Sequence, residues 1–478
     1  MKKQPGWALP NLKAAQVRTK QEAAIRHELF SVPDSIQGIG VNKRYFLRTY
    51  GCQANERDGE TIAGIMETLG FVATASEDNA DVIILNTCAI RKNAEDKVLG
   101  ELGALKRLYK ENPDLVIGLC GCMAQEEEIV QLLLAKYPQV RLIFGTHNIH
   151  RLPMLLAQAM QKEKTIEVFS AEGEVIEDLP VKRFGKHKAW VNIMYGCDKF
   201  CTYCIVPYTR GKERSRAMED ILKEVRELTA QGYQEVTLLG QNVNSYGKDL
   251  SMQGGFATLL AECAKIGIPR IRFMTSHPWD FSDDMIDVIA QYDNIMPFIH
   301  LPVQSGDSAV LKLMGRRYTI EEYRDLFHRI KNRVKNCAFS TDIIVGFPNE
   351  SEEQFQHTLD IVNECQFDNA YTFIYSPREG TPAAKMTDNI PLEVKQERLY
   401  RLNELVNHYA YLNNAAYRGK IVKVLVDGPS KKNPQITSGY TETNKLVNFV
   451  SKNAQCGDIV EVRITDAKTW SLDGEQVE

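Results

Sequence analysis

Three cysteines lie close together near the middle of the chain, at Cys197, Cys201 and Cys204, in the spacing Cys-x3-Cys-x2-Cys. A structural zinc site needs four ligands and a [4Fe-4S] cluster has four irons, so three thiolates leave either a distant fourth ligand or an open coordination position. The nearest downstream candidates, Cys263 and His277, have no second ligand at metal-binding spacing. The spacing therefore predicts a [4Fe-4S] cluster with one iron free for a non-protein ligand, and a zinc knuckle is the alternative.

A second set of three cysteines is spread over the first third of the chain. Cys52, Cys88 and Cys122 each follow a predicted strand, in a region where strands alternate with helices and so predict a parallel sheet. Ligands of such sheets bind at the carboxyl ends of the strands, where these thiols should meet and hold a second cluster with an open iron. Cys120 lies on its strand and is predicted to be a packed core thiol. The strands are expected at 45–50, 81–86, 115–119 and 140–144, and the helices at 56–69, 94–109, 124–136 and 151–161.

Length and composition limit the class of protein. A chain of 478 residues suggests roughly three domains, and a net charge of −4 means that any nucleic-acid contact must come from a local basic patch. The eleven cysteines are odd in number, and the first forty residues have no apolar run of the kind found in secretory signals. We therefore expect a soluble, cytoplasmic protein, with no membrane span, whose cysteines bind metal.

The sequence predicts four regions. Residues 1–42 form an extension without a strong apolar period, apart from a helix within 12–30, and are expected to become ordered on binding. Residues 43–161 form the open parallel-sheet domain of the first cluster. A charged, irregular linker at 163–188 leads into the central domain at 183–413. The all-β domain at 416–478 ends the chain.

The central region contains six strand-like runs separated by helical ones, and a long helix over 392–417 ends it. Six such units predict a partial parallel (β/α)6 barrel, because the residues for two further units are absent. Chemistry in these barrels sits at the carboxyl ends of the strands, and the loop of Cys197 follows the first of them. The strands are expected at 190–194, 235–239, 271–274, 298–301, 339–345 and 370–375.

The last region changes to short alternating strands and predicts a small closed barrel of OB-like size. Basic residues in its loops are interleaved with Tyr440, Phe449 and Trp470, which favours RNA binding over an ordinary lysine-rich surface. The strands are expected at 421–426, 436–440, 445–450 and 459–464, with a last turn at 470–472. The basic residues are Arg418, Lys420, Lys431, Lys432, Lys445, Lys452 and Lys468.

The two cysteine sets and the terminal barrel together resemble the methylthiotransferases, which are radical S-adenosylmethionine (SAM) enzymes with two [4Fe-4S] clusters and an RNA-binding TRAM domain. The resemblance extends from about residue 43 to the end. The segments 51–56 and 238–247 are most similar to the branch that makes 2-methylthio-isopentenyladenosine in tRNA. Ala54 departs from that pattern, since a larger side chain is expected there, but it affects no ligand.

The resemblance implies a radical reaction on the isopentenylated adenosine at position 37, beside the anticodon. The cluster of the central loop would reduce bound SAM, and the resulting radical would take the hydrogen from carbon 2 of the base, whose unactivated C–H bond gives acid–base catalysis little to act on. The N-terminal cluster would present a sulfur already methylated by another SAM. SAM itself is expected against Gly240, Gln241, Asp342 and Gly346.

The resemblance also implies partners. The terminal domain would hold the anticodon arm of tRNA mainly through its phosphates, and an electron donor such as flavodoxin or ferredoxin would reduce the enzyme, which is expected to be a monomer. Two alternatives keep the chemistry and change the substrate to threonylcarbamoyl-adenosine in tRNA or to an aspartate of a ribosomal protein. A third is a non-catalytic, zinc-containing RNA-binding protein.

Overall fold

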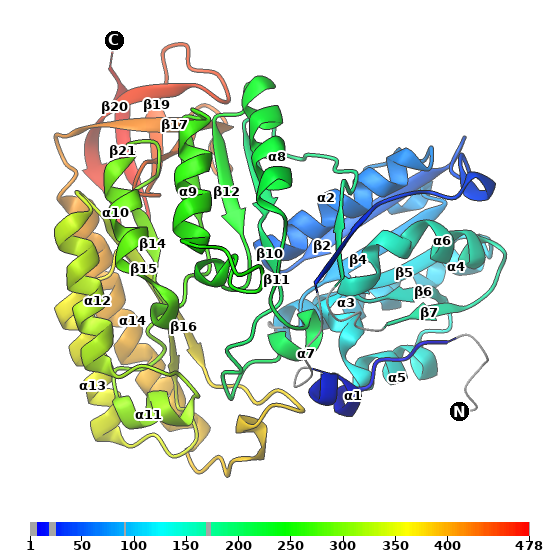
Figure 1. Cartoon of the computed structure of the whole chain (residues 1–478), viewed down its shortest axis with the longest axis horizontal. Coiled ribbons are helices and arrows are strands. Elements are labelled where there is room, and N and C mark those ends of the chain that lie inside the picture. The colour runs from blue at the N-terminus through cyan, green and yellow to red at the C-terminus, as the bar shows by residue number, and fades with distance from the viewer. Residues whose placement is uncertain (1–6, 19–24, 90–91, 169–173, 478) are drawn as a thin grey trace. The chain divides into compact units, whose positions relative to one another are not determined.

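A computed structural model describes residues 7–18, 25–89, 92–168 and 174–477 of the chain (Figure 1). Within these ranges, none of the helices combines the length and the apolar character needed to cross a membrane. The chain forms two compact units. The first comprises Met1–Phe184, Asn192–Asp198 and Ile205–Asp220, and the second comprises Gly185–Val191, Lys199–Cys204 and Ile221–Glu478.

The first unit is built on a six-stranded parallel sheet in the order β3-β2-β4-β5-β6-β7. Its central strands β4, β5 and β6 are buried along their whole length because helices cover both faces of the sheet, so they appear in the sequence as apolar runs. The strands are β2 (Arg44–Tyr50), β3 (Val72–Ala73), β4 (Val82–Thr87), β5 (Val116–Gly121), β6 (Val140–Phe144) and β7 (Thr165–Glu167).

Helices α2 (Gln53–Thr68) and α6 (Leu152–Met160) pack on one face of this sheet, through Ile62 and Leu152 among others. Helices α3 (Lys92–Ala104) and α5 (Glu127–Lys136) pack on the other, through Val98 and Leu133 (Figure 1). The predicted parallel-sheet domain is thus confirmed.

The helix predicted over 94–109 is two helices. Helix α3 ends at Ala104, and α4 (Lys106–Glu111) follows after Leu105. Gly100 and Gly103 stand just before the break, and glycine costs about 1 kcal/mol relative to alanine in a helix interior. The apolar period alone does not reveal such a break.

The extension contains part of the predicted helix, and both the extension and the linker contain strands that the sequence did not predict. In the extension, α1 (Leu12–Arg18) is a helix, and β1 (Arg26–Leu29) pairs in parallel with β8 (Glu174–Glu177) from the predicted linker. The linker also supplies β7 to the sheet. Every residue of β1 is exposed, so this strand gives no apolar signal. Of the helix predicted within 12–30, positions 19–24 lie outside the described residues.

The second unit carries the six predicted strands in two three-stranded sheets, β13-β12-β9 and β14-β15-β16. The pairs β12–β13, β14–β15 and β15–β16 are parallel, as expected for a partial barrel of βα units. The strands are β9 (Lys188–Asn192), β12 (Glu235–Leu239), β13 (Arg270–Phe273), β14 (Phe298–His300), β15 (Ala338–Val345) and β16 (Asn369–Ile374). The helices are α8 (Met218–Ala230), α9 (Gly255–Lys265), α10 (Asp283–Gln291), α11 (Ser308–Leu313), α12 (Ile320–Arg333), α13 (Glu352–Cys365) and α14 (Leu392–Ala415).

The run predicted as a single strand at 190–194 is divided. Strand β9 ends at Asn192, and β10 (Met194–Tyr195) pairs antiparallel with β11 (Arg214–Ser215) inside the first unit. The stretch 190–194 contains four apolar residues and one asparagine without a break, so the sequence does not mark the change of partner.

The last module of the second unit is the predicted closed barrel, drawn in orange and red in Figure 1, with the order β17-β18-β19-β21-β20. The turn predicted at 470–472 leads into a fifth strand, β21, which pairs in parallel with β19 and antiparallel with β20. The sequence of β21 contains two acidic residues and a glycine but no β-branched side chain, so it gives only a weak strand signal. The strands are β17 (Ile421–Pro429), β18 (Thr437–Thr441), β19 (Leu446–Val450), β20 (Ile459–Ala467) and β21 (Leu472–Gln476).

Candidate functional site

The structure brings Cys52, Cys88 and Cys122 to one edge of the first unit's sheet. They follow β2, β4 and β5, which are neighbouring strands. A Cβ added at Gly51 would lie 2.4 Å from the Cys88 Cβ, so glycine is needed where the first of these loops passes the second. The predicted convergence of the three strand ends is confirmed, and iron ligation by these thiols remains a prediction.

Cys120 lies apart from this group. It is fully buried in the apolar cluster under α2 and α6, as expected of a core thiol. Burial raises the pKa of its thiol well above the ordinary value.

The thiols at the sheet edge differ in their electrostatic surroundings. A hydrogen bond with Cys88 lowers the pKa of the Cys52 thiol, and the charge of Arg210 adds to this effect against the opposing effect of burial. Burial raises the pKa of the Cys122 thiol, although Arg210 again opposes it. Iron binds the thiolate, so a nearby cation favours the ligating form of these side chains.

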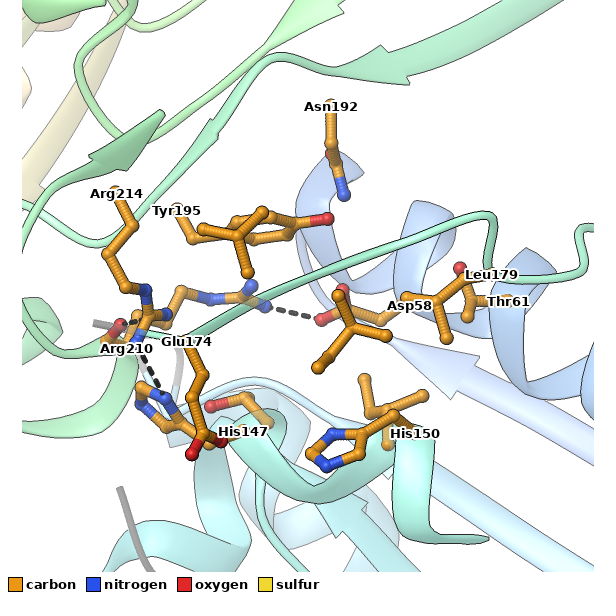
Figure 2. Close-up of a pocket in the computed structure, with 14 residues that line it drawn as sticks. Asp58, Thr61, His147, His150, Glu174, Leu179, Asn192, Tyr195, Arg210 and Arg214 are labelled. Carbon is orange, nitrogen blue, oxygen red and sulfur yellow. Dashed lines mark hydrogen bonds and ion pairs between the residues drawn. The ribbon is translucent and has the colours of Figure 1, made fainter. Parts of the chain in front are cut away.

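Arg210 is the cation of this site and ends the short helix α7 (Val206–Arg210). Its Nε donates to the Cys122 Sγ at 3.3 Å, and its Nη2 donates to the Asp58 Oδ2 at 2.7 Å and to the Asn55 Oδ1 at 3.5 Å. Figure 2 shows Arg210 reaching toward Asp58 along the wall of a cavity of about 80 Å³, which Tyr195 also lines. These partners of the thiols were not predicted, because a single arginine and a single aspartate form no spacing pattern.

The donor set suits an iron–sulfur cluster. Over residues 7–18, 25–89, 92–168 and 174–477, no three His, Cys, Asp or Glu side chains are gathered tightly enough to hold a single metal ion. A [4Fe-4S] cluster binds each thiolate on a different iron and so needs thiols that surround a space. Three thiols at one sheet edge, with a cation donating to one of them, fit that requirement.

The central loop is divided between the two units. Cys197 belongs to the first, where its N–H donates to the Gly211 carbonyl at 3.1 Å. Cys201 and Cys204 belong to the second, where the Cys204 N–H donates to the Cys201 carbonyl at 3.0 Å. Arg316 Nη1 donates to the Cys201 Sγ at 3.6 Å.

A buried carboxylate anchors the part of the loop that lies in the second unit. Lys199, between the first two cysteines of the loop, places its Nζ 2.7 Å from the Asp280 Oδ2. Lys248 Nζ lies 2.5 Å from the Asp280 Oδ1, and Asn242 donates to the Oδ2 at 2.6 Å. Burial alone would raise the pKa of Asp280, but the hydrogen bonds from both lysines hold it far below its usual range. Asp280 was not predicted from the sequence.

Three of the four predicted SAM contacts follow strands of the second unit, and the fourth, Asp342, lies within a strand. Gly240 and Gln241 follow β12, and the Gly240 carbonyl accepts a bond from the Thr275 hydroxyl. Asp342 is half-buried on β15, with its Oδ2 3.4 Å from His300 Nε2.

Gly346 follows β15 at a φ of +69°, and its N–H donates to Glu350 at 2.7 Å. A Cβ there would lie 2.5 Å from the Lys395 Cγ, so the turn requires glycine for its own geometry. Gly240, Gln241 and Gly346 therefore follow strands, Asp342 lies within β15, and the contact of all four with SAM stays a prediction.

Two of the residues predicted for the RNA-binding surface are buried and cannot contact RNA. Lys445 is buried and its Nζ bonds Asp368 at 2.5 Å, and Phe449 lies in the core of the small barrel. Trp470 is exposed. The remaining basic residues are also exposed, and they are Arg418, Lys420, Lys431, Lys432, Lys452 and Lys468.

The fold and the two thiol sets define a protein of the radical SAM class, and models of known families agree. Residues 191–362 match the radical SAM superfamily, residues 44–145 match the uncharacterized protein family UPF0004, and residues 415–477 match the TRAM domain. Among solved structures, the radical SAM methyltransferase TsrM from Kitasatospora setae, with cobalamin and a [4Fe-4S] cluster bound, has a TM-score of 0.53 at 12% identity. The match covers 72% of this chain and 74% of that one, and it shows similarity of fold.

Curated relatives are much closer in sequence. The tRNA-2-methylthio-N(6)-dimethylallyladenosine synthase of Bacillus subtilis is 60% identical over 470 residues, which cover 98% of this chain and 92% of that protein. The synthase of Bacillus cytotoxicus is 59% identical over 471 residues, with the same coverage. The chain therefore belongs to the family of tRNA-2-methylthio-N(6)-dimethylallyladenosine synthases, which are radical SAM methylthiotransferases.

Proposed function

We propose that this chain replaces the hydrogen on carbon 2 of isopentenylated adenosine in tRNA with a methylthio group. The main support for the proposal is sequence identity of 59–60%, over 98% of this chain, to synthases that are named for this product. Dimethylallyl and isopentenyl are two names for the same substituent here. The enzyme is a transferase that uses SAM and two [4Fe-4S] clusters.

The chemistry explains why the fold carries two thiol sets. Carbon 2 has an unactivated C–H bond and no leaving group, so a side-chain acid or base has little to act on. When bound, SAM and the two clusters supply the radical that removes the hydrogen and the methylated sulfur that replaces it. The protein's own residues hold these groups, orient the base and exclude water.

We assign the SAM-binding cluster to Cys197, Cys201 and Cys204. Support comes from their spacing and from the anchoring of the loop, in which Asp280 holds Lys199 and Arg316 donates to a ligand sulfur. SAM is assigned to Gly240, Gln241, Asp342 and Gly346. The family resemblance supports all four, and the position of Gly240, Gln241 and Gly346 just after strands adds to it.

We assign the second cluster, which presents the sulfur, to Cys52, Cys88 and Cys122. Support comes from their convergence at one sheet edge and from the cation that donates to Cys122.

The substrate partner is tRNA, which the TRAM match also favours. We propose that the TRAM domain grips the anticodon arm at position 37 through exposed lysines, that flavodoxin or ferredoxin supplies electrons, and that the enzyme acts as a monomer. We place it in the cytoplasm because its tRNA substrate is there.

Mass analysis of tRNA nucleosides from a strain lacking the gene tests the substrate. We expect isopentenyladenosine to accumulate and its methylthio form to disappear, and to return when the gene is restored. Methylthio-isopentenyladenosine that persists in the deletion strain would contradict the proposal. Loss of methylthio-threonylcarbamoyl-adenosine, or of the modified ribosomal aspartate, would instead favour an alternative substrate.

Anaerobic reconstitution with iron and sulfide tests the chemistry. We expect broad visible absorption and cleavage of SAM after reduction. Tightly bound zinc without that absorption would identify a non-catalytic RNA-binding protein instead.

A further inference from the structure

Arg210 and Asp58 form a buried ion pair beside the N-terminal thiols. Arg210 is 7% exposed and Asp58 is 6% exposed, and the Arg210 Nη2 lies 2.7 Å from the Asp58 Oδ2. The Nε of the same guanidinium donates to the Cys122 Sγ at 3.3 Å. One side of the guanidinium therefore faces the Asp58 carboxylate, as Figure 2 shows, and its Nε edge faces the Cys122 sulfur.

Another buried arginine of this unit shows that this arrangement is not a general way to bury the side chain. Arg141 is also 7% exposed, and it donates to two backbone carbonyls, of Ala159 at 3.4 Å and of Pro113 at 2.8 Å. Arg141 thus satisfies two backbone carbonyls, one in the last turn of α6 and one in the loop that follows α4. Arg210 instead gives its donors to a ligand sulfur and to an acid that balances its charge.

Arg210 is held in its charged form next to the thiols. Burial alone would lower the pKa of Arg210, but the charges of Asp58 and of the thiols raise it well above its ordinary value. A hydrogen bond to a ligand sulfur and a nearby positive charge both stabilise the more negative, reduced form of an iron–sulfur cluster. A carboxylate behind the cation opposes this effect through space.

We propose that Arg210 and Asp58 act as a charge-balanced pair of positioning residues that sets the reduction potential of the cluster held by Cys52, Cys88 and Cys122. The proposal rests on the assignment of those thiols under the proposed function. Arg210 raises the potential by its charge and its bond to sulfur. Asp58 orients the guanidinium and lowers the potential by its own charge.

If the pair acts through its charges, its two single variants should shift the reduction potential in opposite directions. A purely structural role does not predict this. Arg210→Gln removes the cation and leaves Asp58, so the potential should fall. Asp58→Asn keeps an acceptor for the guanidinium but removes the opposing charge, so the potential should rise. The double variant should return close to the value of the unaltered protein. Loss of packing would move both single variants in the same direction.

The test is a redox titration, with mediators, of the full-length chain in which Cys197, Cys201 and Cys204 are replaced by alanine so that one cluster remains. The cluster is followed by electron paramagnetic resonance. We expect each single variant to change the ratio of reduced to oxidised cluster at least tenfold at a fixed potential, which is about 59 mV for a one-electron couple. Arg210→Lys keeps the charge without the fork of donors, so its potential should lie between those of Arg210→Gln and the unaltered residue.

The exposed pair Arg107–Asp78 provides matched controls in the same unit. Its Arg107 Nη2 and Asp78 Oδ1 lie 2.9 Å apart, close to the 2.7 Å of the buried pair, but both side chains are 63% exposed. Arg107→Gln and Asp78→Asn should leave the potential unchanged, because solvent screens both charges.

Shifts of the same sign in Arg210→Gln and Asp58→Asn, or an unchanged potential in Asp58→Asn, would overturn the proposal. The titration needs no tRNA, so it is independent of the nucleoside assay. A cluster that titrates as predicted in a protein without methylthiotransferase activity would contradict the function and leave the role of the pair intact. A full-length chain that binds no cluster at these thiols would contradict both.

Discussion

Each thiol set has one buried arginine that donates to a cysteine sulfur, and the two arginines differ in what balances their charge. Arg210 donates to Cys122 and is paired with Asp58. Arg316 donates to Cys201, and its other bonds go to the Pro302 carbonyl and the Tyr318 hydroxyl, both at 3.0 Å. Those two partners are neutral.

The difference matters because we propose different tasks for the two sites. Within the part of the chain that the structure describes, no acid bonds the Arg316 cation, which favours the more negative, reduced form of the cluster that we propose reduces SAM. At the N-terminal site a carboxylate offsets the cation, which suits the sulfur-presenting role that we propose there. The comparison predicts that the two sites respond differently when their ligands and their arginines are changed.

The largest effect should come from the cysteines themselves. Cys197→Ala should abolish cleavage of SAM to 5'-deoxyadenosine, whereas Cys88→Ala should leave cleavage measurable and stop the formation of methylthio-tRNA. Chromatography of both products from one reaction measures this. The reverse pattern would mean that the roles of the two sites are exchanged.

Cys120→Ala is the matched control for the N-terminal site. This thiol is two residues from Cys122 and lies in the apolar core. Iron content per chain should fall in Cys122→Ala and stay unchanged in Cys120→Ala.

Arg316→Gln should lower the potential of the central cluster, because a cation near its sulfur is removed. At a fixed solution potential the ratio of reduced to oxidised cluster should then fall about tenfold, and SAM cleavage should slow with it. The check is a redox titration of the full-length chain with Cys52, Cys88 and Cys122 replaced by alanine. An unchanged potential in Arg316→Gln would show that this cation does not set the potential of the central cluster, contrary to the comparison.

Asp280→Asn should destabilise the second unit, because it leaves Lys199 and Lys248 without their shared carboxylate. Breaking a buried ion pair typically costs about 3 kcal/mol of unfolding free energy. Urea unfolding of the apo-protein measures the change. Asp283→Asn, which breaks surface pairs with Arg329 and Arg333, should change it little and is the control.

The smallest effect is expected at the RNA surface. Lys431→Gln should flatten the slope of the logarithm of tRNA affinity against that of salt concentration by about 0.9 or less, because one phosphate contact is lost. Lys445→Gln should leave this slope unchanged and instead lower the free energy of unfolding, because the Lys445 Nζ forms a buried ion pair with Asp368. Binding measured at several salt concentrations distinguishes the two.

The sequence predicts the convergence of the N-terminal cysteines because the evidence for it is their position in the fold. Cys52, Cys88 and Cys122 each follow a strand of a parallel sheet, and the sheet itself brings them together. The spacing within the central loop is local and needs no fold. The long, regular helices and the buried strands are predicted for the same reason, since their apolar periods are strong.

The groups that tune and anchor the sites are not predictable in this way. Arg210 and Asp58 are 152 residues apart, and Arg316 and Cys201 are 115 apart. Each is a single charged residue without a motif, so only tertiary structure reveals the pairing. The strands β1 and β8 are missed because they have four residues each and β1 buries none of them.

The central claim is methylthiolation of isopentenyladenosine, and one reaction tests it most directly. The reconstituted enzyme is incubated under anaerobic conditions with reductant, SAM carrying a labelled methyl group, and tRNA isolated from a strain without this enzyme. The account predicts labelled 2-methylthio-isopentenyladenosine at position 37 together with 5'-deoxyadenosine. Formation of 5'-deoxyadenosine without label in that nucleoside, by an enzyme with both clusters bound, would contradict it.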